Sequence, residues 1–337
     1  MSSSVMTEPS EGIPREGISP MKRSVAYLPI TLFSVVMGLS GLAIAWQKCF
    51  PGSSVAHALS LSIGLFASVL FIILLGMYGW KTLRHTDEVR TELHHPVRLN
   101  FFPTISVNML LLSVFWQSTS MLAITLWTAG MLLQLVLTIY VMSSWLNHSH
   151  FSIEHVNPSW FIPMVGNIVV PINGIFLGYE EISWFFFSVG LLFWLVLLVI
   201  VMYRLLFHEQ LPLRLLPTYF ILLAPPSVGF ISYSGLIGGL DNGARLLYYC
   251  ALFWAMLLGC NAIRFWRVPF VLSSWAFSFP LAALSIATIK MAELSQQPCL
   301  SWLARLLVIL LSVIVSWLVF RTIQAAMKGK VCTPELK

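Results

Sequence analysis

Long apolar stretches alternate with short polar connections along almost the whole chain. A helix needs roughly 20 apolar residues to cross the hydrocarbon core of a bilayer. We identify such stretches at 26–47, 57–80, 99–117, 120–145, 158–178, 183–206, 214–237, 245–266, 269–289 and 301–326. The pattern predicts an all-α integral membrane protein whose ten transmembrane helices occupy residues 26–327. Residues 1–25 and 328–337 are expected to form polar tails, the first of them disordered.

Composition supports a membrane domain. Hydrophobic residues make up 58% of the 337 residues and charged residues 9%, whereas soluble domains carry about 25% charged residues. No positively charged start leads directly into a short apolar core with a small-residue cleavage site. We therefore expect the first apolar segment to be a retained span rather than a cleaved signal peptide.

The basic residues orient the predicted spans. With ten spans both termini lie on one side, and 15 of the 19 lysines and arginines fall on that side, against 4 on the other. Because cytoplasmic loops are enriched in lysine and arginine, both termini are expected in the cytoplasm, with the protein in the plasma (inner) membrane. The net charge of +6 has the same explanation, and no nucleic-acid partner is expected.

The prolines are distributed unevenly between alternate spans. Those well within spans all fall in odd-numbered ones: Pro29, Pro103, Pro163, Pro171, Pro217, Pro225, Pro226 and Pro280. Proline kinks or breaks a helix, and freed backbone groups in a membrane must be satisfied by protein or water. This favours five helical hairpins, with kinked odd helices around a central pore and straight even helices outside. The alternative is that prolines are simply common in membrane helices.

The predicted spans carry no acidic residue near their middle. Intramembrane charges usually mark proton relays or ion-coupling sites, so their absence suits a neutral conduit. Small polar residues remain on the odd spans, and either line a pore or join helices by hydrogen bonds. The candidates for the pore lining are Thr31, Ser34, Asn108, Asn167 and Ser278, together with Pro280.

Motifs of catalysis or metal binding are missing. The stretch from Gly229 to Gly235 does not form G-x-S-x-G, and the paired histidines near residues 94 and 148 lack zincin spacing. We expect no enzyme activity, no cofactor and no metal site.

Several short motifs resemble one family. They are Trp275-Ala-Phe-Ser-Phe279, Glu92-Leu-His-His-Pro-Val-Arg98, Phe161-Ile-Pro-Met-Val-Gly-Asn167, Leu222-Leu-Ala-Pro225 and Leu28-Pro29. Their order and spacing are similar to those of the tellurite-resistance/dicarboxylate transporter (TehA-like) family, which includes the plant slow-type guard-cell anion channels. The resemblance covers residues 27–330, approximately the whole membrane domain.

The resemblance implies a homotrimer with a pore in each protomer, closed by a phenylalanine of the ninth span. The matching residue is Phe279, whereas Phe277 points about 200° around a helix from it. Pro280 would fix the kink that holds the ring. The first span departs from the family's G-Y-F-G, since it reads Thr31-Leu-Phe-Ser34, so glycine-lined packing is not expected there.

The expected function is passive conduction of small anions such as chloride and nitrate. Arg98, Arg214 and Arg267 begin inner spans and are candidates for a cytoplasmic vestibule. The main alternative is a secondary carrier for dicarboxylates such as malate, or a tellurite efflux protein. A receptor or scaffold would leave the proline pattern unexplained.

Overall fold

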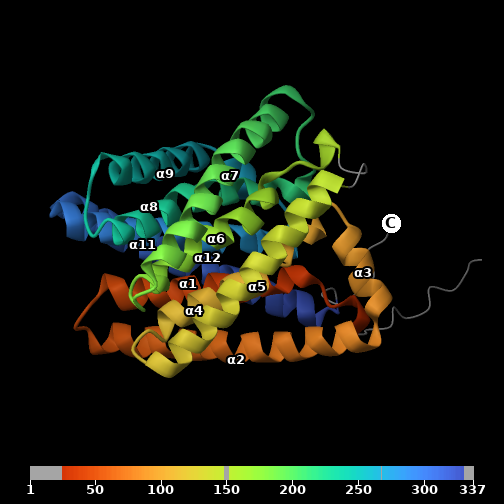
Figure 1. Cartoon of the computed structure of the whole chain (residues 1–337), viewed down its shortest axis with the longest axis horizontal. Helices are drawn as coiled ribbons and strands as arrows, with labels where there is room; N and C mark the ends of the chain where they lie inside the picture. Colours follow the sequence, from red (N-terminus) through yellow and green to blue (C-terminus); the bar gives the residue numbers. More distant parts are fainter. Residues whose placement is uncertain (1–24, 148–151, 267, 330–337) are drawn as a thin grey trace, which may run out of the picture.

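A computed structural model describes residues 25–147, 152–266 and 268–329, and every regular element in these ranges is helical. Almost all of both predicted tails lies outside the described residues. A helix lies in each of the ten predicted segments (Figure 1). The odd segments contain α1 (Phe33–Cys49), α4 (Thr104–Phe115), α6 (Phe161–Gly174), α8 (Ala224–Leu236) and α11 (Ser278–Ser295). The even segments contain α2 (Ser54–Arg84), α5 (Ser120–Asn147), α7 (Glu180–Phe207), α9 (Asn242–Cys260) and α12 (Pro298–Met327).

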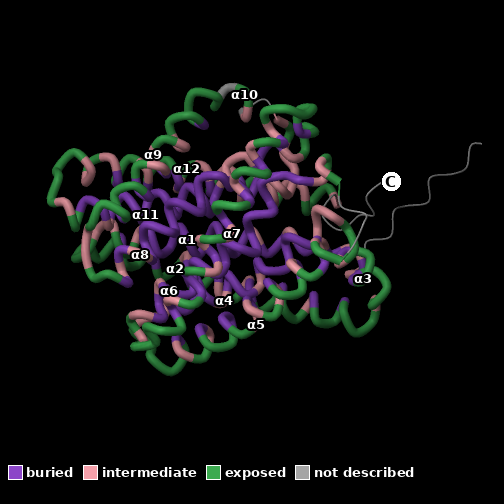
Figure 2. The backbone as a smooth tube through the Cα atoms, turned by 45° about the horizontal axis from the view of Figure 1, so that its top comes forward, coloured by how far each residue is buried: buried purple, intermediate pink, exposed green. Residues whose placement is uncertain are grey.

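Burial separates these two sets of helices. The most apolar windows of α2, α5, α7, α9 and α12 are only 28–33% buried, whereas those of the segments containing α1, α4 and α8 are 83% buried and that containing α11 67%. Figure 2 shows the buried backbone concentrated in the middle of the molecule and the exposed backbone around it. The set that carries the prolines is therefore the inner one, and the exposed apolar set surrounds it.

Nine segments of the described chain are long and apolar enough to cross a bilayer. The segment outside this set is α6, which with the preceding 3-10 turn η5 (Pro158–Trp160) ends at Gly174 rather than at the predicted residue 178. Its length of roughly 27 Å follows from the helical rises. Because α6 is buried along nearly its whole length, it does not need to match the full hydrocarbon thickness.

Each inner α-helix is preceded by a stretch of 3-10 helix. These stretches are η2 (Ile30–Leu32), η3 (Arg98–Phe101), η5, η6 (Leu213–Leu223) and η7 (Leu272–Phe277). The prolines lie at these starts rather than in mid-helix: Pro103 caps α4, Pro163 is third in α6 and Pro280 is third in α11. The first turn of an α-helix leaves its N–H groups unpaired, so proline costs little there. Pro171 is different, because it lies inside α6.

Consecutive inner and outer helices contact each other extensively, as α1 with α2, α4 with α5, α6 with α7, α8 with α9 and α11 with α12. Short turns join the helices of each pair. Gly178 and Gly238 have φ values of 84° and 64°, a left-handed conformation that glycine adopts without steric cost. Asp241 caps α9 by accepting a hydrogen bond from the Ala244 amide at 2.8 Å, and this bond lowers the pKa of its carboxyl group.

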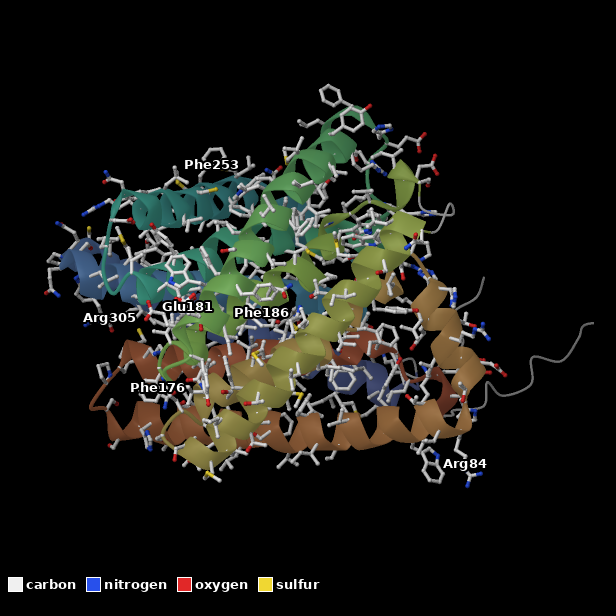
Figure 3. The ribbon with its side chains drawn as sticks, viewed as in Figure 1. Arg84, Phe176, Glu181, Phe186, Phe253 and Arg305 are labelled. Carbon is white, nitrogen blue, oxygen red and sulfur yellow. The ribbon has the colours of Figure 1, made fainter. Side chains whose placement is uncertain are left out.

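A tryptophan with an arginine over its ring lies at each end of the bundle. The Arg84 guanidinium is 5.1 Å from the ring of Trp80, and that of Arg305 is 5.0 Å from the ring of Trp302. Both tryptophans are more than half exposed. Figure 3 shows the two arginines at opposite ends of the molecule. Tryptophan is typical of the two membrane–water interfaces, and between these ends the outer helices present apolar residues.

Candidate functional site

An apolar cavity lies among the five inner helical segments. Its lining comes from all of them: Ser34 and Met37; Phe101 and Val107; Ile162, Val165 and Gly166; Ile221 and Ala224; Trp275, Ala276, Phe279 and Pro280. The cavity volume is about 40 Å³, room for no more than a few water molecules, since one water needs about 10–15 Å³ by the same measure. Segments far apart in the sequence thus converge on one narrow space.

The lining is apolar with one exception, the hydroxyl of Ser34. The indole N–H of Trp275 is used elsewhere, because it donates to Thr322 Oγ1 at 2.9 Å. Among the described residues, no charged side chain lines the cavity. A narrow hydrophobic constriction resists wetting, and ions cannot cross a dry constriction. The described lining of this cavity thus has the apolar, uncharged character of a hydrophobic constriction.

Phe279 reaches the cavity from the junction of η7 and α11. It is the second residue of α11 and is 9% exposed. Pro280 follows and also lines the cavity. Phe277 points elsewhere, with its ring 4.6 Å from that of Phe220 in an edge-to-face arrangement. The two phenylalanines of the motif thus have different surroundings.

The other candidates for the pore lining lie outside this cavity. Thr31 is half-buried in η2. Asn108 Nδ2 donates to the Phe33 carbonyl at 2.9 Å, and Asn167 Nδ2 donates to the Pro163 carbonyl at 2.9 Å. Ser278 Oγ donates to the Trp275 carbonyl at 2.7 Å. The two asparagines and Ser278 each donate to helix backbone, and Asn167 Nδ2 also donates to Thr138 Oγ1 at 3.0 Å. Of these polar candidates only Ser34 borders the cavity.

Sequence reasoning missed most of the apolar lining. Phe101, Ile162 and Ala224 each lie within two residues of a proline, and this is the signal that could have pointed to them. It also missed the buried Gln134 of α5, whose Nε2 donates to the Pro163 carbonyl at 2.7 Å and whose Oε1 accepts from Ser106 at 2.7 Å. This amide ties α4, α5 and α6 together beside the cavity.

Two of the three candidate vestibule arginines lie where inner segments begin. Arg98 opens η3 and is half-buried, and Arg214 is exposed in η6. Arg267 lies outside the described residues. In the part of the chain that is described, no cluster of three or more histidine, cysteine, aspartate or glutamate residues has the arrangement of a metal site.

A buried ion pair lies near the same end. Lys81 Nζ is 3.0 Å from Glu92 Oε2, and the two side chains are 1% and 6% exposed. Glu92 belongs to α3 (Thr86–His94), a short helix within the connection that the hydrophobic pattern predicts between the spans 57–80 and 99–117. Lys81 Nζ also donates to the Leu28 carbonyl at 2.9 Å, and Tyr78 OH donates to Glu92 Oε2 at 2.6 Å. The pair thereby joins α2 and α3 to the residue before Pro29, where the first inner segment begins.

Residues 27–323 match the family model described as the SLAC1 voltage-dependent anion channel. The match covers most of the chain and contains all five inner segments. The protein belongs to the SLAC1 family. It is a multi-pass membrane protein of a family of anion channels, and catalysis is not the activity that this membership implies.

Relatives of this SLAC1 family member include plant and bacterial proteins. The S-type anion channel SLAH2 of Arabidopsis thaliana is 32% identical over 273 residues, covering 79% of this chain and 53% of that protein. The S-type anion channel SLAH3 of the same plant is 31% identical, with coverages of 87% and 47%. The tellurite resistance protein TehA homolog of Haemophilus influenzae is 27% identical, with coverages of 77% and 79%. The chain spans about half the length of these two plant channels.

Close packing of α1 against α11 holds the Phe279 segment in this family member. A Cβ atom added at Gly38 would overlap the Ser278 hydroxyl and lie 2.7 Å from Ser278 Cβ, and one at Gly41 would lie 2.6 Å from Ala282 Cβ. These approaches are too short for carbon atoms, so only glycine fits without movement. Glycine-lined packing is thus present in the first inner helix, one turn beyond the Thr31–Ser34 stretch in which the sequence analysis did not expect it.

Gly38→Ala is expected to destabilise the protein by about 1–3 kcal/mol, the usual cost of overpacking a closely packed interface. The measurement is thermal unfolding of the purified protein in detergent. Gly76→Ala on α2 is the matched control, because a Cβ there meets nothing within 4 Å and alanine favours the helix. Ser278→Gly should restore part of the stability lost in Gly38→Ala. Equal unfolding temperatures of Gly38→Ala and Gly76→Ala would contradict the packing argument.

Proposed function

We propose that this protein is a passive anion channel that conducts small anions such as chloride and nitrate. The pore would run between α1, α4, α6, α8 and α11 of each protomer, and Phe279 would close it. The observation that carries the proposal is the apolar cavity to which all five inner segments and Phe279 contribute. A hydrophobic gate of this kind needs no charged group at the constriction, because dewetting alone stops ions.

The surroundings of the inner helices support the proposed membrane arrangement. Ten helices in five hairpins would place the exposed apolar faces of the outer helices against lipid, with residues 26–327 as the membrane domain. The charge distribution of 15 basic residues against 4 favours cytoplasmic termini in the plasma (inner) membrane. The assembly would be a homotrimer, as the family resemblance implies. Light scattering of the detergent-solubilised protein tests this, and the mass of a single chain would reject it.

Passive conduction is tested most simply in liposomes. Proteoliposomes loaded with chloride and exposed to nitrate should exchange the anions down their gradients when the Phe279→Ala variant is used, without a requirement for protons or sodium. Empty liposomes and liposomes with a heat-denatured sample are the controls. Failure to exchange either anion would reject the channel proposal.

A secondary carrier for dicarboxylates, or tellurite efflux, is the second candidate function. The similarity to a tellurite resistance protein homolog over most of both chains favours it. A coupled carrier would accumulate malate against its gradient when a proton gradient is imposed. The apolar, uncharged cavity lining offers no carboxylate for such coupling. The same liposomes, given malate and a pH gradient, distinguish the two functions.

Basic residues at the inner-helix starts are proposed to attract anions to the mouth of the pore. Arg98 and Arg214 lie at these starts, and Arg267 is included from its place in the sequence. Replacement of each by alanine should lower the single-channel conductance of the Phe279→Ala background in dilute salt. The reduction should shrink at high ionic strength, because salt screens exposed charges. Unchanged conductance in all three variants would contradict the proposed role of these arginines in a vestibule.

A further inference from the structure

A second, larger cavity lies at the end of the bundle where the inner segments begin. It has a volume of about 570 Å³ and lies between the α7–η6 connection and the end of α9. Its lining residues are Gln210, Leu211, Leu213, Leu216, Cys260, Asn261, Arg264 and Val268. None of these lines the Phe279 cavity, so the two spaces are distinct.

One side of this end cavity is polar and basic. Arg264 Nη2 donates to Gln210 Oε1 at 2.8 Å, and both side chains are exposed. Asn261 adds an exposed amide group. Nearby, Arg204 is 4% exposed, its Nη1 donates to the carbonyl of Glu209, and its Nε has no hydrogen-bond partner in the described part of the chain. Glu209 is the acidic residue of this connection, so the arginines outnumber it and the potential favours an anion.

The other side of the end cavity is apolar and continuous with an exposed helix face. Leu213 is 64% exposed, and Cys260 is exposed at the end of α9. The same helix exposes Phe253 and Met256 by 61% and 64%. Figure 3 shows Phe253 projecting away from the bundle. An apolar path therefore leads along α9 to the cavity.

We propose that this end cavity binds an anionic phospholipid of the adjoining leaflet. The phosphate group would lie against Arg264 and Asn261, where charge-assisted hydrogen bonds are available. The upper part of an acyl chain would cover Leu213, Leu216 and Cys260. A free inorganic anion would leave this apolar half exposed to water, so the combined lining favours a lipid. The inference rests on the membrane position given under the proposed function.

A lipid bound in the end cavity would influence the position of Phe279 through the adjacent 3-10 segments η6 and η7. Leu213 and Leu216 belong to η6, which packs along η7. Ser273 Oγ donates to the Arg214 carbonyl at 2.7 Å, and the rings of Phe220 and Phe277 pack at 4.6 Å. Phe279 follows η7 directly. A bound lipid would thus restrain the segment that positions the proposed gate.

The test is native mass spectrometry of the purified full-length protein with added phosphatidylglycerol or phosphatidylcholine. The wild type should bind phosphatidylglycerol about fivefold more tightly, the effect that one basic residue has on an anionic lipid. Arg264→Gln should remove this preference. Arg245→Gln is the matched control and should leave the preference unchanged. Arg245 is also an exposed arginine, but it lies near the start of α9, whereas Arg264 lies in α10 (Ala262–Trp266), just beyond the other end of α9.

Two competitors test whether the bound phosphate group must belong to a lipid. Glycerol 3-phosphate, which lacks acyl chains, should not displace phosphatidylglycerol at equal concentration, and neither should the uncharged dioleoylglycerol. Equal lipid binding by the wild type and Arg264→Gln would overturn the proposal, as would full displacement by glycerol 3-phosphate. Lipid binding is measured by mass spectrometry and not by current. The binding result therefore holds even if the protein does not conduct anions.

Discussion

Replacement of Phe279 by alanine is expected to raise the anion conductance roughly tenfold or more. The ring lines a cavity with a volume of only about 40 Å³, and its removal widens and wets the constriction. A barrier lowered by only ~1.4 kcal/mol already gives a tenfold increase in rate. The measurement is the current through purified protein in a planar bilayer. The size series Phe279→Leu and Phe279→Ala should give successively larger currents.

Phe277→Ala is the control for this prediction. Phe277 belongs to the same motif but packs against Phe220, outside the cavity. Its truncation should leave the conductance close to that of the wild type. A rise of similar size in both variants would indicate general loosening of η7. An unchanged current in Phe279→Ala would show that the ring does not limit conduction.

Replacement of Lys81 by methionine is expected to destabilise the protein by ~3–5 kcal/mol, the usual cost of leaving one member of a buried ion pair uncompensated. Glu92 would keep Tyr78 as a hydrogen-bond donor but would lose its cation. The Leu28 carbonyl would also lose its lysine donor. Thermal unfolding in detergent should show a decrease of roughly 5–10 °C in the midpoint.

Two variants test whether charge is the cause. The double variant Lys81→Met/Glu92→Gln removes both charges and should recover much of the stability lost in Lys81→Met, since a neutral buried pair carries no unpaired charge. Arg84→Met is the matched control on the same helix, because Arg84 is exposed and lies over Trp80. It should change stability by less than about 1 kcal/mol. A double variant less stable than the single variant would contradict the argument.

Much of the fold is encoded in the hydrophobic pattern and in the prolines. Long apolar runs can be recognised because a membrane helix requires a minimum length, and a helix lies in each predicted segment. The prolines marked the inner segments because broken backbone is tolerated only inside protein. Helical periodicity also separated the direction of Phe279 from that of Phe277.

Other features depend on packing that one sequence does not display. Asn108 and Asn167 bond to backbone of α1 and α6, and which face of a helix carries such a group is decided by its neighbours. The 3-10 starts of the inner helices extend over as many as 11 residues in η6, and they determine which apolar side chains line the cavity. The burial of Lys81 against Glu92 depends on the packing of α3 against α2. No local sequence pattern predicts this packing.

The most direct test of the account is the reversal potential of the Phe279→Ala current in a planar bilayer with a tenfold chloride gradient. Passive anion conduction predicts a reversal near the chloride equilibrium potential and no shift when a pH gradient is added. A reversal at the cation equilibrium potential, or one that moves with the pH gradient, would contradict a passive anion channel.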